Sequence, residues 1–140
     1  MKLILTLFIS LLLTKGCSEY KELEKSKIVY EASSRGYFKM IIIENKTLLI
    51  QNVREGKAQE VKLTDLEWKK LATLFKKIDL STYNTLEGPT QERYYDGKPH
   101  ANLSFTKDKV DYVTLGFDHT IPPAQIKELV DAILKLSQNK

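Results

Sequence analysis

The chain has 140 residues, of which 42% are hydrophobic and 29% are charged, with 22 Lys and Arg against 18 Asp and Glu. This length and composition describe one ordinary globular domain, and 6 Gly with 4 Pro exclude collagen-like or low-complexity character. A single Cys excludes both a disulfide framework and a thiolate-rich metal cluster, because each needs several sulfurs.

Residues 1–16 have the pattern of an export signal. Lys2 supplies a positive start, the run from Leu3 to Leu13 is mostly aliphatic, and the small Gly16 ends the segment. The apolar run is too short for a membrane-spanning helix, which needs about 20 apolar residues. We therefore assign residues 1–16 to a signal peptide and leave them out of the predicted fold.

Cys17 follows this segment directly and is the only Cys in the chain. Its position resembles that of the acylated Cys in bacterial lipoprotein signals, where the thiol receives a diacylglyceryl group and the Cys becomes the first mature residue. Thr14 and Lys15 depart from the usual pattern, which has Leu at the first of these positions and a small uncharged residue at the second. The alternative is cleavage after Gly16 with Cys17 left as a thiol.

Residues 18–27 are mostly charged and lack apolar periodicity, so residues 17–27 are predicted to be the lipidated Cys and a flexible tether. Each buried CH₂ of an acyl chain such as palmitate contributes about 0.8 kcal/mol, so one chain holds only marginally and two or three chains on one Cys anchor strongly. We expect an outer-membrane lipoprotein that faces the periplasm or the cell surface.

Removal of the signal peptide takes away Lys2 and Lys15, which leaves 20 basic against 18 acidic side chains. The net charge of the mature chain therefore does not indicate a nucleic-acid partner.

Residues 28–140 are predicted to form a single α+β domain, which begins with three strands. β-branched and aromatic residues are frequent over 28–33, 37–44 and 47–53, and turn-forming residues separate these runs. The run 37–44 is apolar on both faces, which predicts a central strand.

A helix is predicted to follow these strands. Thr64 and Glu67 have the spacing of a capping box, and Leu63 can pack on Trp68 as a hydrophobic staple. Apolar residues then recur at helical spacing as far as Ile78, which predicts one stripe facing the sheet. We interpret Trp68 as a packing residue of that stripe.

The stretch 79–100 has no sustained period, and a loop of this length is uncommon inside a compact domain. It is either functional or contains an element without a clear pattern, such as a short strand at 92–95. Tyr94 and Tyr95 lie in it beside Arg93, a mixture that binding surfaces favour. The alternative is a loop pinned to the domain by its aromatic rings.

Two more strands and a helix complete the domain. Residues 101–106 alternate cleanly, and Val113, Leu115 and Phe117 are predicted to form the inward face of a fifth strand, whose parity extends to His119. Pro122 and the residue after it suit the start of a final helix. The order βββαββα predicts a five-stranded antiparallel sheet with both helices packed on one face.

Few residues in the sequence have side chains suited to catalysis or metal binding. His100 and His119 are the only histidines, and with Asp96 and Asp118 they supply the donor types of a metal site or an acid–base pair. The sequence has no HExxH, no GxSxG and no Gly-rich phosphate loop, so we assign no catalytic residue, metal or cofactor. Asp118 and His119 also suit a structural role before the last helix.

Arg35 lies in a predicted turn between Ser34 and Gly36. An Arg in such a position can form a bidentate contact with a carboxylate. A partner among Glu92, Asp96 and Asp118 would clamp the long loop to the sheet edge. The alternative interpretation is a contact with an anionic ligand.

Three short sequence blocks can be compared with a known protein family. They are Ser33-Ser34-Arg35-Gly36-Tyr37, then Tyr95-Asp96-Gly97 with His100, and Phe117-Asp118-His119 with Pro122-Pro123. These blocks resemble a family of small uncharacterised Bacteroidota proteins, many of which have lipoprotein signals, over most of residues 28 to 136. No activity is established for that family, so the resemblance implies a fold and a lineage and transfers no catalytic residue.

The sequence therefore favours a lipid-anchored binding or accessory domain of the bacterial envelope, with an envelope protein as partner. The candidate binding residues are Arg35, Tyr94, Tyr95, Asp96, His100, Asp118 and His119. One alternative is a periplasmic or surface enzyme or metal-binding protein that uses Asp96, His100, Asp118 and His119. Another is an inhibitor or immunity-type protein that presents its aromatic loop to a target.

Overall fold

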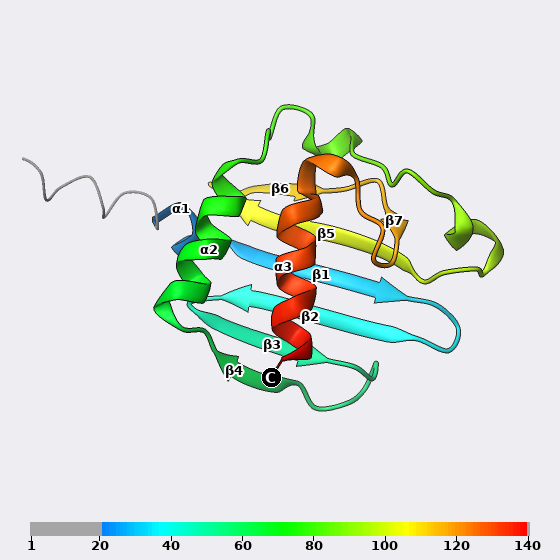
Figure 1. Cartoon of the computed structure of the whole chain (residues 1–140), viewed down its shortest axis with the longest axis horizontal. Coiled ribbons are helices and arrows are strands. Elements are labelled where there is room, and N and C mark those ends of the chain that lie inside the picture. The colour runs from blue at the N-terminus through cyan, green and yellow to red at the C-terminus, as the bar shows by residue number, and fades with distance from the viewer. Residues whose placement is uncertain (1–20, 140) are drawn as a thin grey trace, which may run out of the picture.

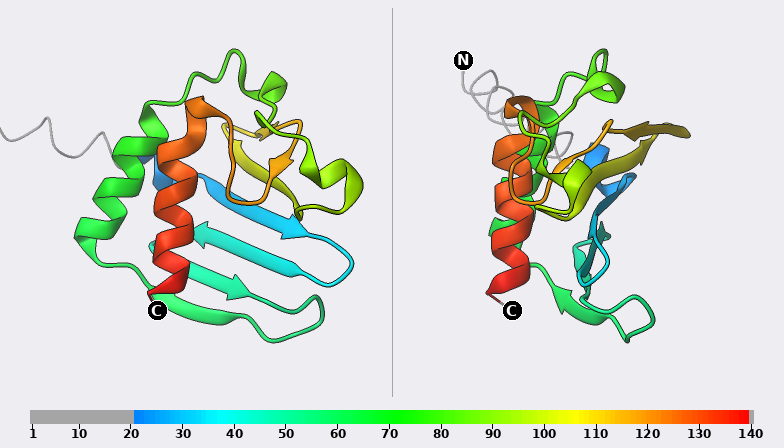
Figure 2. Two further views of the ribbon diagram at one scale, coloured as in Figure 1. Left: turned by 45° about the vertical axis from the view of Figure 1, so that its right-hand side comes forward. Right: turned by 90° about the vertical axis from the view of Figure 1, so that its right-hand side faces the viewer.

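The computed structural model describes residues 21–139, so the predicted signal peptide and Cys17 lie outside the described residues. One open antiparallel sheet is covered on one face by two helices, and the right-hand view of Figure 2 shows both helices on the same side. The domain is thus of the mixed α+β type. Within residues 21–139, no helix has the length and apolar character needed to cross a membrane.

Seven strands form the sheet in this part of the chain. They are β1 Lys27–Ser33, β2 Phe38–Glu44, β3 Thr47–Gln51, β4 Gln59–Lys62, β5 His100–Lys107, β6 Val110–Val113 and β7 Phe117–Asp118. Their order is β4-β3-β2-β1-β5-β6, and β7 pairs with β5 beyond the end of β6 (Figure 1). Each pairing is antiparallel.

The helical elements are α1 Lys21–Glu24, α2 Asp65–Lys76 and α3 Lys127–Gln138, with 3₁₀ turns η1 Tyr83–Thr85, η2 Glu92–Tyr95 and η3 Ala124–Ile126. The predicted capping box of α2 is confirmed, because Thr64 Oγ1 accepts from the Glu67 N–H at 3.2 Å and the Glu67 carboxylate accepts from the Thr64 N–H at 2.9 Å. Trp68 is 2% exposed, as its packing role requires.

The core lies between the helices and the sheet face that they cover. Ile28, Tyr30 and Ala32 of β1 are all fully buried, and Tyr30 stands between Ile41 of β2 and Leu103 of β5 in the register. Strand β2 lies between β1 and β3, so the prediction of a central strand is confirmed. The face of β2 that points away from the helices, however, is not covered by any element of residues 21–139 (Figure 2).

The predicted strand count is wrong because two short strands gave no recognisable pattern. β4 has the sequence Gln-Glu-Val-Lys and forms a sheet edge, where a charged strand needs no apolar alternation. β7 has only two residues and is defined by its pairing with β5. Neither strand could be recognised from periodicity.

The predicted inward face over 113–117 is also wrong for two of its three residues. Val113 is 46% exposed and Leu115 is 60% exposed, whereas Phe117 is fully buried. Gly116 has φ +114°, and the Leu115 N–H donates to the Leu86 carbonyl rather than to β5. The chain therefore leaves the sheet after β6 and returns as β7.

The structure also corrects the predicted tether. From Lys21 the chain forms α1, and β1 begins at Lys27. Leu23 is 1% exposed in the core, and Ser26 donates to the Glu22 carbonyl at 2.8 Å. A single apolar residue in a charged segment gives no periodic pattern in the sequence. In the structure, however, the buried side chain of Leu23 attaches this segment to the domain.

Candidate functional site

Several loops meet at one end of the sheet, which we call the loop end. It comprises the hairpin after Ser33, the segment 87–99 and the residues that follow β7 (Figure 1). The register brings them together, because His100 pairs with Ser33 on one side and with Asp118 on the other. The loop end lies opposite α1 in the domain (Figure 1).

Asp118 is the centre of the polar interactions in the loop end. It is fully buried, and its two carboxylate oxygens accept four hydrogen bonds. Oδ2 accepts from Thr90 Oγ1 at 2.6 Å and from the Glu92 N–H at 2.9 Å. Oδ1 accepts from the N–H and the Nη1 of Arg93, at 3.0 and 3.1 Å.

Arg93 completes this network with a side chain that is also fully buried. Its Nη2 donates to Glu87 Oε1 at 2.9 Å, and its guanidinium carbon lies 4.4 Å from the centre of the Tyr94 ring. Burial raises the pKa of Asp118, but the hydrogen bonds from Thr90 and Arg93 outweigh that effect and lower it to about 2. Asp118 is therefore ionised across the physiological range.

The Asp118–Arg93 pair attaches the long loop to β7, which corrects two sequence expectations. Arg35 is exposed and has no ion pair or hydrogen bond with a described residue, so Arg93 and not Arg35 clamps the loop. The segment Glu92–Tyr95 is a 3₁₀ turn rather than a strand, which lets its backbone N–H groups point at Asp118. An Arg inside an irregular segment has no periodic pattern that would reveal its partner.

His119 is enclosed by two tyrosines on the inner side of the sheet. Tyr30 Oη lies 2.7 Å from Nδ1, and Tyr37 Oη lies 2.9 Å from Nε2. The Tyr30 hydroxyl also accepts from the Thr120 N–H, and we assign the tautomer in which its own O–H donates to Nδ1. The neutral imidazole therefore carries its proton on Nε2 and donates it to Tyr37.

The environment of His119 favours this neutral form. Burial lowers the pKa of His119, and the positive charges of Lys39 and Lys98 lower it further. Lys39 is half-buried and donates to Asn52 Oδ1 at 3.1 Å. Burial also lowers the pKa of Lys39.

The lowered pKa of His119 predicts how stability depends on pH. Below pH 6.5 the unfolded chain takes up a proton at this position before the folded chain does, so the free energy of unfolding should decrease as pH falls from 6.5. The contribution of neutral His119 to the free energy of unfolding should be complete above pH 6.5. Urea unfolding at several pH values from neutral to mildly acidic should show a smaller decrease for His119→Gln than for the wild type. An equal decrease in both proteins would contradict this assignment.

The remaining predicted residues do not converge on one point. Tyr94 and Tyr95 are 63% and 73% exposed, and Asp96 ends η2 in the left-handed region at φ 59°. His100 is exposed and lies against Gly116, where an added Cβ would come within 2.4 Å of its Nε2.

Asp96, His100, Asp118 and His119 do not form a metal-ligand cluster. Asp118 is committed to Arg93, and both ring nitrogens of His119 face tyrosine hydroxyls. In residues 21–139, no group of three or more His, Cys, Asp or Glu side chains could hold a metal ion.

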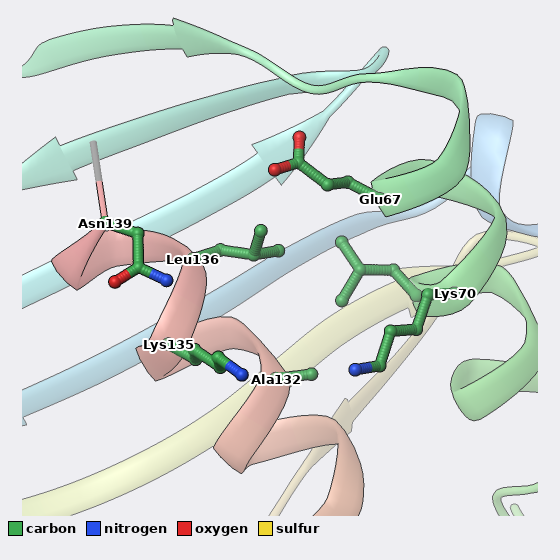
Figure 3. A pocket seen from close by; sticks show the side chains of 7 residues that line it. Glu67, Lys70, Ala132, Lys135, Leu136 and Asn139 are labelled. Atoms are coloured by element: carbon green, nitrogen blue, oxygen red, sulfur yellow. The ribbon is translucent and has the colours of Figure 1, made fainter.

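A separate groove lies between the two long helices. Figure 3 shows it with Lys70 and Lys135 on either side of Ala132. Its full lining is Glu67, Lys70, Leu71, Ala132, Lys135, Leu136 and Asn139. Helix α2, which forms one wall of the groove, and the hairpin between β1 and β2 lie on opposite sides of α3 (Figure 1), so the groove is not part of the loop end.

The fold and the loop end together define a mixed α+β domain with an open antiparallel sheet and a polar, loop-built surface at one end. Comparison of the chain with protein-family models, with curated proteins and with solved structures found no match.

Proposed function

We propose that this protein is a lipid-anchored binding domain of the bacterial envelope. The observation that carries the proposal is the position of Cys17, the only Cys, directly after an apolar run of export-signal length. Acylation of its thiol would attach the chain to the outer membrane, and two or three acyl chains would make release slow. An envelope protein is the proposed partner.

The shape of the domain supports a binding surface that points away from such an anchor. The first described residue, Lys21, belongs to α1, and β1 runs from this end of the domain to the loop end (Figure 1). Seven strand residues span about 20 Å at roughly 3.3 Å each. An anchor before α1 would therefore leave the loop end accessible.

The loop end also presents aromatic side chains on a fixed backbone. Tyr94 and Tyr95 are exposed, while Arg93, the residue before them, is tied to Asp118. Exposed tyrosines on a preorganised segment lose little conformational freedom on binding, and tyrosine is enriched at protein interfaces. Both the accessory-domain proposal and the inhibitor or immunity-type alternative use this surface.

Metabolic labelling with a fatty-acid analogue tests the anchor. The wild type and the matched control Ser18→Ala should incorporate the label, whereas Cys17→Ala should incorporate none. Equal label in all three proteins would rule out Cys17 as the acylated residue.

Capture from native envelopes tests the surface. A partner that purifies with the wild type should be lost when Tyr94 and Tyr95 are both replaced by Ala, and retained by Leu66→Ala. Leu66 is the matched control because it is 78% exposed on α2, away from the loop end. Retention of the partner by the tyrosine variant would contradict the assignment of this surface.

A further inference from the structure

The inner sheet face ends in polar side chains where the helices no longer cover it. Side chains alternate along strands, so Lys39 shares the face of the buried Ile41, and Asn52 shares the face of the buried Ile50. Tyr37 lies two residues before Lys39 and packs against the edge of the core. The hairpin between β1 and β2, which carries Tyr37 and Lys39, extends past α3 (Figure 1).

These side chains offer hydrogen-bond donors that no described residue uses. The Lys39 ammonium donates one hydrogen bond to Asn52, and no carboxylate of residues 21–139 lies within 4.0 Å of it. Tyr37 accepts the Nε2–H of His119, which leaves its own O–H for another acceptor. Half-buried ammonium groups in proteins are usually paired, whereas Lys39 has no carboxylate partner among residues 21–139.

Two positive charges act on His119. Besides burial, the side chains of Lys39 and Lys98 both lower its pKa. The Pro99 carbonyl accepts the His119 N–H at 2.9 Å, which holds the segment after Lys98 next to His119. Asp118, the residue before His119, is already neutralised by Arg93.

We propose that Tyr37, Lys39 and Lys98 form a binding site for an oxyanion, the carboxylate or phosphate group of a small ligand. The Lys39 ammonium and the Tyr37 O–H donate to the oxyanion, and Lys98 adds long-range attraction. Tyr30 and His119 act behind them, because the chain of hydrogen bonds from Tyr30 through His119 orients the Tyr37 hydroxyl. This site does not depend on the lipid anchor.

The test is a titration of the full-length protein in a nonionic detergent, followed by NMR at constant ionic strength. Inorganic phosphate is the first probe and succinate is the second, so that the two oxyanion types are compared directly. Saturable shifts are expected at the Lys39 amide and the His119 imidazole. Lys39→Met should weaken binding by about tenfold or more, and Tyr37→Phe by about threefold to tenfold.

Lys69→Met is the matched control, because Lys69 is an exposed cation on α2. It should bind the probes as the wild type does. The proposal would be overturned if neither probe gave saturable shifts at millimolar concentration, or if Lys39→Met and Lys69→Met weakened binding equally. Because binding is read at the site itself, its failure is distinct from a failure of acylation at Cys17.

Discussion

Asp118→Asn is expected to lower the free energy of unfolding by about 3 to 5 kcal/mol. The carboxylate and the Arg93 guanidinium are both fully buried, so removing one charge leaves the other without its partner in the interior. The amide that replaces the carboxylate also carries an NH₂ group where Asp118 now receives only hydrogen-bond donors. The loop that Arg93 holds should separate from β7 in the variant.

Urea unfolding at neutral pH measures this effect, with Asp131→Asn as the control. Asp131 is an exposed carboxylate that pairs with Lys127 along α3, and such pairs contribute about 0.3 to 0.5 kcal/mol. Arg93→Met should destabilise the domain in the same way, because it leaves Asp118 buried and unpaired. A value for Asp118→Asn as small as that of the control would show that the pair does not organise the loop end.

Gly88→Ala is expected to cost about 1 to 3 kcal/mol through overpacking. A Cβ at Gly88 would lie 2.5 Å from Phe117 Cβ and 2.8 Å from Phe117 Cα, and the second of these atoms belongs to the backbone of β7. The Gly88 N–H donates to the Gly116 carbonyl at 2.9 Å, so the two segments cannot separate without losing a hydrogen bond.

Gly36→Ala is the matched control for this position. A Cβ at Gly36 would meet no heavy atom within 4 Å, and the substitution restricts the unfolded chain. It should be neutral or stabilising by up to about 1 kcal/mol. Thermal unfolding of both variants provides the comparison, and equal midpoints would contradict the close contact between Gly88 and β7.

Elements with regular patterns could be predicted from the sequence. The α2 cap follows from Thr64 and Glu67 alone, since both partners of the capping box lie within one turn. The position of β2 inside the sheet agrees with the prediction from its apolar run, although the helices cover only one of its faces. The mixed α+β class and the antiparallel sheet follow from the order of these elements.

Features that depend on distant contacts could not be predicted. β4 and β7 are defined by the strands beside them, and the exposure of Leu115 depends on a backbone bond to Leu86. The sequence predicts a tether around Leu23, because a single apolar residue creates no periodic pattern, whereas the structure buries Leu23 in the core.

The candidate site was predictable only in part. His119 contacts Tyr30 on the inner side of the sheet, but the predicted strand parity does not explain this, because the chain leaves the sheet between β6 and β7. The partnership of Arg93 with Asp118 joins residues 25 positions apart in irregular segments, and no local pattern indicates it. Lys39 is one polar residue within a largely apolar strand, and its lack of a counter-charge depends on the residues that fold around it.

The most direct test of the proposed anchor is the mass of the native protein isolated from the envelope after detergent phase partitioning. The account predicts a chain that begins at Cys17, carries the added mass of a diacylglyceryl group and partitions into the detergent phase. A chain found in the aqueous phase, with an unmodified Cys17 thiol, would contradict it.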